Sequence, residues 1–285
     1  MSVIIKARNL GKKYGRFEAL KNINLDIHSG RIVGLIGPNG AGKTTLLKAL
    51  LGLTSYDGEL SVLDKNPFKQ RHQLMQDISF IADVAVLPKW IRVNEVLDFV
   101  ESVHPRFSRT EALRHLNRTK IRSRQKVAEL SKGMVVQLHL ALVMAIDAKL
   151  LVLDEPTLGL DILFRKEFYD NLLNDYFDHQ RTILITTHQV EEVEHILTDL
   201  LFIKNGEIVL DASMDEITEN YFEVLVHPDK LEQARQMNPL TERTIFNKHI
   251  MLFRQSDKQL LEPLGEIQRP GVADLFVALL KEDQQ

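Results

Sequence analysis

Short apolar runs separated by glycine-rich or polar turns recur through the first two hundred residues of the chain. The runs at 31–36, 150–155 and 181–188 are rich in β-branched residues and leucine, which is typical of strands buried inside a sheet. Residues 9–27 instead alternate apolar and polar positions around a turn at Tyr14-Gly15, which predicts a small antiparallel sheet. Together these patterns predict an α/β fold with a mixed sheet and an additional antiparallel β-subdomain.

Apolar positions with helical spacing lie between the predicted strands. Residues 44–53 have this spacing and end near Gly52, so they predict one helix. Most of 92–146 is predicted to be helical, which indicates a helical subdomain. Its most apolar part, 134–146, is only 13 residues long. A bilayer span needs about 20 residues, so a buried helix is the better interpretation.

The chain changes character after a hairpin predicted at 201–213 from its Asn205-Gly206 turn. Beyond it we expect short strands and a final helix, which form a small α+β appendage without a recognisable motif. The predicted strands are 222–226, 244–247 and 250–253, and the predicted helix is 271–283. We therefore expect a main domain at 1–212, with its helical subdomain at about 84–146, and an appendage at 213–285.

Composition adds little that is specific. Among 285 residues there is no cysteine, which excludes disulfides and thiolate metal sites, and the net charge is −3. A charge at Lys6 argues against a signal peptide at the N-terminus. The segment 106–126 holds eight Lys and Arg and one acid, Glu111. It fits a solvated helical face, contact with an acidic partner or anionic lipid, or, least well, nucleic acid.

One loop carries chemistry. Residues 37–44 read GPNGAGKT, which is G-x-x-x-x-G-K-[ST] between a predicted strand and a predicted helix. Glycines let backbone N–H groups turn toward a phosphate, and the helix start adds its positive dipole end. Lys43 is placed to reach the β- and γ-phosphates, and the Thr44 hydroxyl to ligate Mg²⁺. The sequence therefore predicts a nucleotide phosphate cradle.

Further candidates follow two other predicted strands. Asp154 ends a buried strand and is suited to hold Mg²⁺, and Glu155 is placed to polarise an attacking water. The alternative for Glu155 is an acid at the start of a helix. His188 ends the next strand and is either a structural histidine or a contact to the γ-phosphate.

Residues 130–134, LSKGM, precede the strand of Asp154, and here the chain resembles the ATP-binding cassette (ABC) ATPase family. Tyr14 is similar to the family's adenine-stacking aromatic, and 37–44 resembles Walker A. Residues 130–134 resemble the LSGGQ signature, 150–155 resemble Walker B, 159–161 resemble the D-loop, and His188 resembles the switch histidine. The motifs occur in the family's order across residues 1 to about 212.

The resemblance implies how these residues act. Two cassettes would enclose two Mg·ATP, with Ser131 and Gly133 closing on the partner's nucleotide, and Glu155, His188 and Lys43 would be catalytic. It implies Thr44, Asp154 and Asp83 as metal-binding positions, with ATP and Mg²⁺ as cofactors. The expected nucleotide-binding residues are Tyr14, Gly37, Pro38, Asn39, Gly40, Ala41, Gly42, Lys43, Thr44, Thr45, Ser131 and Gly133.

Two motifs depart from the family pattern. Asp83 aligns with a glutamine that senses Mg²⁺ and water, so either coupling differs or the alignment is displaced by one residue. Lys132 and Met134 alter the signature, as in cassettes of the ABC-2-like exporter group. We accordingly expect an ATPase that drives a separately encoded membrane permease, with the chain peripheral at the inner, cytoplasmic face of the cell membrane and without nucleic acid as a partner.

Two other functions remain open at this point. One is a soluble cassette that acts as a nucleotide-dependent clamp on nucleic acid or ribosomes. Its only support is the basic segment 106–126, and such proteins usually carry two cassettes in one chain. The other is a nucleotide-binding module with little turnover, which the substitutions at Asp83 and Lys132 would permit.

Overall fold

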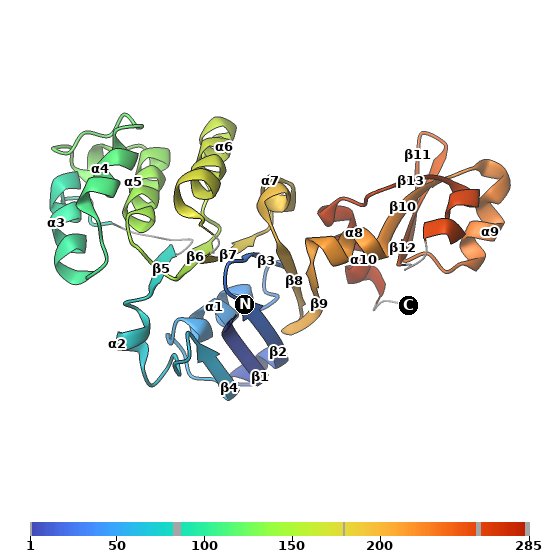
Figure 1. Ribbon diagram of the computed structural model, residues 1–285, viewed down its shortest axis with the longest axis horizontal. Helices are drawn as coiled ribbons and strands as arrows, with labels where there is room; N and C mark the ends of the chain where they lie inside the picture. The colour runs from blue at the N-terminus through green and yellow to red at the C-terminus, as the bar shows by residue number, and fades with distance from the viewer. Residues whose placement is uncertain (1, 82–86, 179, 255–257, 283–285) are drawn as a thin grey trace.

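A six-stranded sheet forms the centre of the computed structural model, which describes residues 2–81, 87–178, 180–254 and 258–282 (Figure 1). All its neighbouring strands run parallel except the last pair, which is an antiparallel hairpin. The strands are, in spatial order, β5 (Ile78–Ile81), β6 (Leu150–Asp154), β7 (Thr182–Thr187), β3 (Ile32–Ile36), β8 (Asp199–Lys204) and β9 (Glu207–Ser213). This confirms the strands predicted at 31–36, 150–155 and 181–188 and the hairpin at 201–213.

A three-stranded antiparallel sheet and one helix cover one face of the central sheet (Figure 1). They are β2 (Phe17–His28), β1 (Val3–Tyr14), β4 (Asp57–Val62) and α1 (Lys43–Leu50). Alternate residues of the central strands point to this side, among them Val33, Leu35 and Val152, and all are buried. The predicted hairpin is present, with Tyr14 paired to Phe17. Helix α1 ends before Gly52, whose φ of 65° suits a glycine.

Helices pack on the opposite face of the sheet. They are α6 (Ile162–Asn171), which continues as a π turn (Leu172–Tyr176), α7 (Val190–Val193), which continues as a 3₁₀ turn (Glu194–Ile196), and α10 (Val272–Glu282). The other half of each strand's alternation, including Ile36 and Phe202, points into this layer. Asp161 caps α6 by accepting a hydrogen bond from the Phe164 N–H at 3.1 Å.

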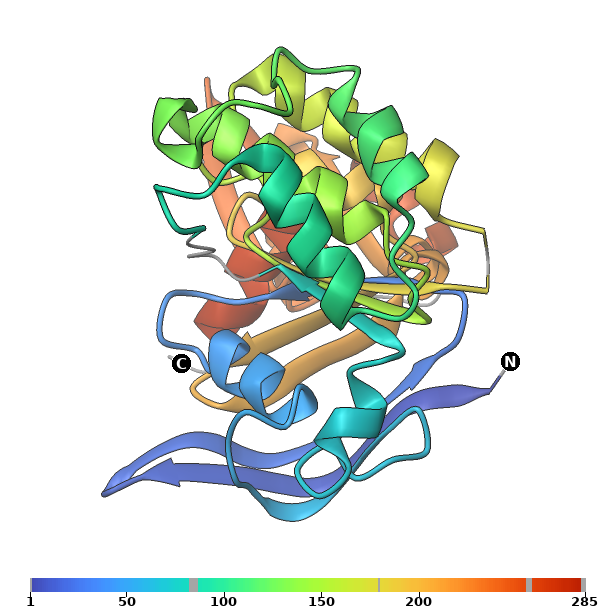
Figure 2. The same cartoon turned by 90° about the vertical axis from the view of Figure 1, so that its left-hand side faces the viewer.

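A helical subdomain lies at one end of the molecule, as Figure 2 shows in front view. It consists of α3 (Val93–Val103), α4 (Arg109–Leu116), a 3₁₀ turn (Val127–Glu129) and α5 (Lys132–Met144), and the short α2 (Arg71–Leu74) lies before it in the chain. Ser108 caps α4 and Ser131 caps α5 through their hydroxyl oxygens. Residues 134–146 thus lie largely in a helix that is buried among its neighbours, as predicted.

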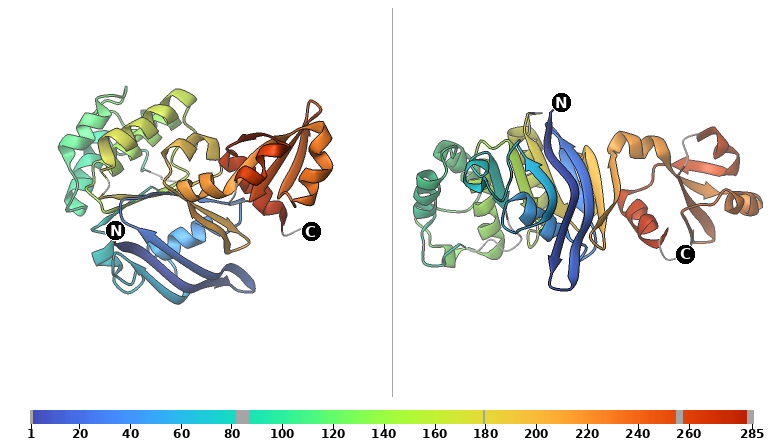
Figure 3. Two further views of the ribbon diagram at one scale, coloured as in Figure 1. Left: turned by 45° about the vertical axis from the view of Figure 1, so that its right-hand side comes forward. Right: turned by 90° about the horizontal axis from the view of Figure 1, so that it is seen from below.

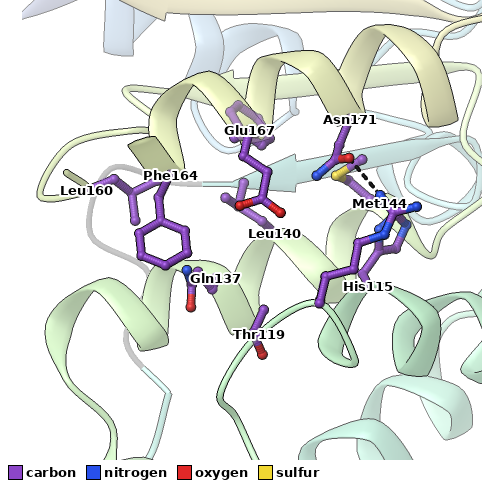
Figure 4. Close-up of a pocket in the computed structure, with 12 residues that line it drawn as sticks. His115, Thr119, Gln137, Leu140, Met144, Leu160, Phe164, Glu167 and Asn171 are labelled. Carbon is purple, nitrogen blue, oxygen red and sulfur yellow. Dashed lines mark hydrogen bonds between the residues drawn. The ribbon is translucent and has the colours of Figure 1, made fainter. Parts of the chain in front are cut away.

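One arginine ties this subdomain to α6. Arg118 donates hydrogen bonds to Asn171 (2.6 Å) and Asp175 (2.7 Å) beyond a small cavity of about 60 Å³. Figure 4 shows this cavity, with Phe164, Glu167 and Asn171 of α6 facing α4 and α5. This polar contact adds to apolar packing, because Leu140, Val143 and Met144 of α5 belong to the buried cluster on the helical face of the central sheet.

The last part of the chain forms a four-stranded antiparallel sheet at the other end of the molecule (Figure 3). Its elements are α8 (Met214–Asn220), β10 (Tyr221–Val226), a 3₁₀ turn (Pro228–Lys230), α9 (Leu231–Gln236), β11 (Thr241–Ile245), β12 (Lys248–Arg254), two 3₁₀ turns (Lys258–Leu260, Glu262–Leu264) and β13 (Gly265–Gln268). The strand order β11-β12-β10-β13 is that of a split β-α-β unit of the ferredoxin-like type, with the 3₁₀ turns in place of the second helix.

The strand predicted at 244–247 is wrong in its second half. Phe246 and Asn247 have φ values of 47° and 60° and form the turn between β11 and β12. Two consecutive left-handed residues make the hairpin turn that fits the twist of the flanking strands. Ile245 and Phe246 suggested a strand in the sequence. A phenylalanine is unusual in such a turn, so the turn was not predicted.

The boundary expected at 212–213 stays a prediction, because α10 returns to the core after the appendage. Leu275, which is fully buried, shares a cluster with Phe202 of β8 and Val193 of α7. Phe276 lies edge-on to Phe202, with ring centroids 5.1 Å apart. The appendage is therefore held to the main domain by hydrophobic packing as well as by the chain.

Within the described residues, no helix has both the length and the apolar character needed to cross a bilayer.

We expect Leu275→Ala to lower the free energy of unfolding by about 2–4 kcal/mol, because it leaves a cavity between α10 and the central sheet. Val277→Ala on the same helix is the control, since Val277 is 46% exposed and its loss should cost less than about 0.5 kcal/mol. Denaturant unfolding measures both. Equal stability of the two variants would mean that α10 is not packed on the core.

Candidate functional site

The loop between β3 and α1 is shaped by close backbone approaches. A Cβ added to Gly37 would lie 2.4 Å from the Ile203 carbonyl oxygen, and one added to Gly42 would lie 2.7 Å from that of Ala19. Gly42 also has a φ of 113° and precedes α1 without a side-chain cap. The first N–H groups of α1 are therefore not capped by a side chain, which is the arrangement that binds phosphate.

Lys43 is folded into this loop. Its ammonium donates to the carbonyl oxygens of Gly37 (2.6 Å) and Pro38 (3.3 Å). Burial lowers the pKa of Lys43, and the carboxylates of Glu155 and Asp154 act in the opposite direction. A desolvated cation whose charged form is favoured by two nearby acids is suited to bind a phosphate.

A cavity of about 280 Å³ opens over the loop. Most of the predicted nucleotide-binding residues line it, together with the two acids of β6 and two residues of β2. The lining residues are Phe17, Ala19, Pro38, Asn39, Gly40, Ala41, Gly42, Lys43, Thr44, Thr45, Asp154 and Glu155. The carboxyl ends of parallel strands meet at one edge of a sheet, which brings the loop after β3 and the acids after β6 together.

Thr186 of β7 fixes the two acids. Its hydroxyl donates to Asp154 Oδ1 at 2.5 Å, and its Oγ1 and carbonyl oxygen accept from the Glu155 N–H at 3.2 and 3.1 Å. Glu155 has a φ of 49°, a left-handed conformation that is unfavourable for a glutamate. These hydrogen bonds stabilise that conformation and turn the Glu155 side chain toward the cavity.

His188 lies beside Glu155, with 2.9 Å between His188 Nδ1 and Glu155 Oε2. Because an ionised carboxylate only accepts hydrogen bonds, Nδ1 carries the proton in this pair. His188 is exposed, whereas the Glu155 side chain is largely buried. The sequence placed these residues at the ends of two strands, and the structure brings them into contact.

Ser131 and Gly133 lie away from this cavity. They begin α5, where Ser131 accepts a hydrogen bond from the Met134 N–H at 3.2 Å. Neither residue is among those that line the cavity, so within this chain the loop at 37–45 and the segment 130–134 are two separate surfaces. Asp83 lies outside the described residues.

Comparison with known proteins identifies the family. A family model described as ABC transporter matches residues 20–158. The ABC transporter ATP-binding protein YtrB of Bacillus subtilis is 29% identical over 98% of this chain and 96% of its own length. Nod factor export ATP-binding protein I of Cupriavidus metallidurans is 31% identical over 89% of this chain and 86% of its own. The chain belongs to the ABC transporter ATP-binding family.

The ABC transporter assignment includes ATP binding and ATP hydrolysis coupled to transport. The direction of transport does not follow from it. The sulfate/thiosulfate import ATP-binding protein CysA of Neisseria meningitidis also matches, at 32% identity over 76% of this chain and 63% of its own length.

A solved structure of the ATP-binding subunit of an ABC transporter superposes on this chain with a TM-score of 0.67. It is 24% identical and covers 75% of this chain and 91% of its own. This likeness confirms the fold class: a mixed α/β core with antiparallel strands and added helices.

Phe17 was missed in the sequence. It lines the cavity and is 62% exposed, directly opposite Tyr14 in the hairpin. Tyr14 is 47% exposed, and Lys12 lies over its ring at 5.1 Å. Tyr14 itself is not among the residues that line the cavity, so its adenine-stacking role stays a prediction, and Phe17 is the aromatic residue in the lining. The sequence pattern that could have indicated Phe17 is an aromatic residue two positions after the turn glycine, Gly15.

Arg165 of α6 was missed as well, and no local pattern marks it. Its Nε donates to the Leu160 carbonyl oxygen in the D-loop-like segment at 2.8 Å, and its NH1 donates to Gln189 Oε1 at 2.7 Å. It also pairs with Glu192 of α7. Gln189 directly follows His188, so Arg165 joins the segment 159–161 to the residues that carry the histidine.

The residues present fit Mg²⁺ bound together with a nucleotide. This ion takes one or two protein oxygens and completes its shell with phosphate and water. Thr44 and Asp154 line the same cavity, and no cluster of three or more His, Cys, Asp or Glu able to hold a metal occurs in the part of the chain that the structure describes. Such a site depends on the phosphates for its remaining ligands.

We expect Lys43→Met to abolish the stabilisation by ATP. For the wild type this stabilisation is about 2.7 kcal/mol when the ATP concentration is a hundredfold above the Kd. Without nucleotide the variant should melt no lower than the wild type, because a desolvated charge has been removed. Lys48→Met, on the exposed side of α1, is the control and keeps the ATP effect. Thermal unfolding with and without ATP measures the stabilisation in each variant.

The same lysine gives a pH signature. Because its pKa is lowered in the folded protein, the unfolded chain binds more protons between that lowered pKa and the ordinary value of 10.5. The free energy of unfolding should therefore rise with pH across this window, and Lys43→Met should lack that contribution. An ATP-induced rise in Tm that survives in Lys43→Met would contradict the phosphate role.

We expect Arg165→Met to lower kcat for ATP hydrolysis about tenfold while KM for ATP changes less than about threefold, because Arg165 positions the residues around His188 and is not in the cavity. The kcat of Arg165→Lys should lie between those of the wild type and Arg165→Met, because one ammonium cannot replace the two donor positions of the guanidinium.

Arg181→Met is the matched control for Arg165. Arg181 is similarly half-buried and makes an ion pair with Asp147 and a hydrogen bond to the Tyr176 carbonyl oxygen, at the opposite end of β7 from His188. If both variants lose activity in proportion to their loss of Tm, Arg165 is merely structural.

Proposed function

We propose that this chain binds Mg·ATP, pairs with a second cassette and drives a separately encoded membrane permease, as an exporter at the inner face of the cell membrane. The observation that carries the proposal is the contact between Glu155 and His188 at the edge of the phosphate cavity.

Each residue of the cavity has a role in this proposal. Lys43 and the loop N–H groups bind the phosphates, and Thr44 and Asp154 hold the Mg²⁺, which neutralises phosphate charge. Glu155 accepts a proton from the attacking water, and His188 donates from Nδ1 to Glu155 and orients its carboxylate. The hydrogen bonds from Thr186 keep Glu155 in place while this happens.

The absence of Ser131 and Gly133 from the lining of the cavity supports pairing with a second cassette. Ser131 and Gly133, at the uncovered start of α5, are available to close on the nucleotide of another copy or of a related chain. The segment beside the D-loop is apolar yet uncovered: Ile162 and Leu163 are each 81% exposed and Leu158 is 48% exposed. Exposed aliphatic residues of this size favour an interface.

A permease contact is supported by a groove at the junction of the core and the helical subdomain. The groove has a volume of about 510 Å³ and lies between α2, β5 and the end of α3. Arg71, Met75, Phe80, Val103 and Pro105 are among its lining residues. Phe68, Phe99 and Val103 are each more than half exposed on these elements and their neighbours. An apolar groove with exposed aromatics nearby fits a short helix or loop of a membrane protein.

Export rests on two supports. The signature-like segment reads LSKGM, as in the ABC-2-like exporter group. One of the relatives that aligns over most of both chains is named for export of a Nod factor. Import is the alternative, as in the relative named for sulfate and thiosulfate.

A soluble clamp on nucleic acid receives less support. Arg106, Arg109, Arg114 and Arg118 of the basic segment make ion pairs with acids of this chain, so half of its charge is neutralised.

We expect Glu155→Gln to reduce ATP hydrolysis by about 10²-fold or more, because an amide cannot accept the proton of the attacking water. ATP binding should persist, and a dimer should accumulate with ATP in gel filtration. Glu191→Gln, an exposed acid of α7, is the control and should keep its turnover. Unchanged hydrolysis in Glu155→Gln would reject the role of Glu155.

The partner is tested by purifying the chain from gently solubilised native membranes and identifying what comes with it by mass spectrometry. A polytopic protein in stoichiometric amount is the expected result. Recovery with ribosomes or nucleic acid in the soluble fraction would overturn the permease proposal. Transport of the cargo by membrane vesicles, measured in each orientation, then separates export from import.

A further inference from the structure

Two loops of the helical subdomain are joined into one surface by backbone hydrogen bonds. The Val93 N–H donates to the Gln125 carbonyl oxygen at 3.0 Å, and the Asn94 N–H donates to that of Ser123 at 2.9 Å. In the other direction the Ala128 N–H donates to the Lys89 carbonyl oxygen at 2.9 Å. Segments 89–94 and 122–128 therefore lie side by side, with their backbones joined.

This surface is basic. Together with Lys120, two residues before the second segment, it carries six exposed cations for which the described residues offer no ion-pair partner, and we call them the basic face: Lys89, Arg92, Lys120, Arg122, Arg124 and Lys126. Arg92 donates instead to the Arg124 carbonyl oxygen at 2.6 Å.

The nearest acids along the chain form no ion pair with the basic face. Glu95 accepts from the Arg92 backbone N–H at 2.8 Å, and Glu129 accepts from the Lys126 backbone N–H at 3.1 Å. Both carboxylates thus cap the starts of short helical segments. Elsewhere in the basic segment the arginines have acidic partners, as Arg109 has in Asp98 and Glu101. Within the basic segment, the cations without an acidic partner among the described residues are therefore those from Lys120 to Lys126.

Trp90 lies within the same surface. It is 73% exposed and follows Lys89 directly. It is also the only tryptophan of the chain. An indole ring that is left in water costs free energy, and rings of this kind are enriched at the boundary between headgroups and acyl chains.

We propose that the basic face, with Trp90 at its edge, binds the anionic headgroups of a lipid bilayer. The diffuse field of a headgroup layer attracts Lys and Arg alike and needs no fixed geometry. Half of the basic face is lysine, a residue that is depleted from protein–protein interfaces. The mixture of lysine, arginine and one exposed tryptophan therefore favours a lipid surface over an acidic protein.

The contact would add to the permease in holding the chain at the membrane, and it requires neither nucleotide nor permease. It can therefore be tested on the chain alone, so its failure is distinguishable from failure of the transport proposal. Each basic side chain near an anionic surface contributes about fivefold to the partition coefficient.

The experiment is a titration of the full chain with vesicles of equal parts phosphatidylglycerol and phosphatidylcholine, with Trp90 emission as the readout. Because Trp90 is the single tryptophan, the emission reports this face alone. We expect a shift to shorter wavelength with anionic vesicles, loss of the shift in high salt, and no shift with phosphatidylcholine alone. Cosedimentation gives the partition coefficient independently of the fluorescence.

Arg122→Glu combined with Arg124→Glu should lower the partition coefficient at least about 25-fold, from the two positive charges lost. Lys248→Glu with Lys258→Glu makes the same change in net charge on exposed residues of the appendage and should leave the partition nearly unchanged. Circular dichroism and ATPase activity check that each variant is folded.

Three outcomes would overturn the proposal. The first is no binding to anionic vesicles, and the second is equal loss of binding in both charge-reversal pairs, which would mean that net charge alone is responsible. The third is an emission shift with an acidic peptide such as polyglutamate but none with vesicles, which would assign the face to an acidic protein.

Discussion

The hydrogen bonds of Thr186 are the constraint on which the site depends. Thr186 is completely buried near the end of β7, the strand between the one that carries the acids and the one that precedes the loop. It holds the Asp154 carboxylate through its hydroxyl and the Glu155 N–H through two oxygens. A residue in the left-handed region costs of order 1–3 kcal/mol and persists only where its surroundings determine it. Here the register of the sheet pairs Asp154 with Thr186, and this pairing fixes the conformation of Glu155.

This constraint also connects the acids to the rest of the machinery. His188 follows Thr186 by two residues, so the strand that fixes Glu155 from one side supplies its hydrogen-bond donor from the other. Arg165 then joins the residue after His188 to the segment 159–161. Arg165 is therefore the physical link between the segment 159–161 and the residues that carry the histidine.

Local chemistry explains which features the sequence predicted. The strands at 31–36 and 181–188 and the hairpin at Asn205-Gly206 follow from residue pattern and turn propensity, and the loop at 37–44 follows from a fixed spacing. The contacts that were missed are non-local. Phe17 lines the cavity together with a loop that comes later in the chain, at 38–45, and Arg165 acts across 24 residues to Gln189. In the appendage, a phenylalanine in a turn concealed the end of a strand, and the strand order depends on pairings that no local pattern contains.

The position of α10 bears on what the appendage can sense. Helix α10 packs on α7, and α7 begins two residues after His188. Glu194, just beyond α7, accepts a hydrogen bond from the Val272 N–H at 3.4 Å, and Lys204 of β8 donates to the Leu280 carbonyl oxygen at 2.6 Å. Because a close-packed interface transmits small movements, any displacement of α7 would be passed on to α10. The appendage therefore contacts the short helix that follows the histidine, even though its own sheet lies at the far end of the molecule (Figure 3).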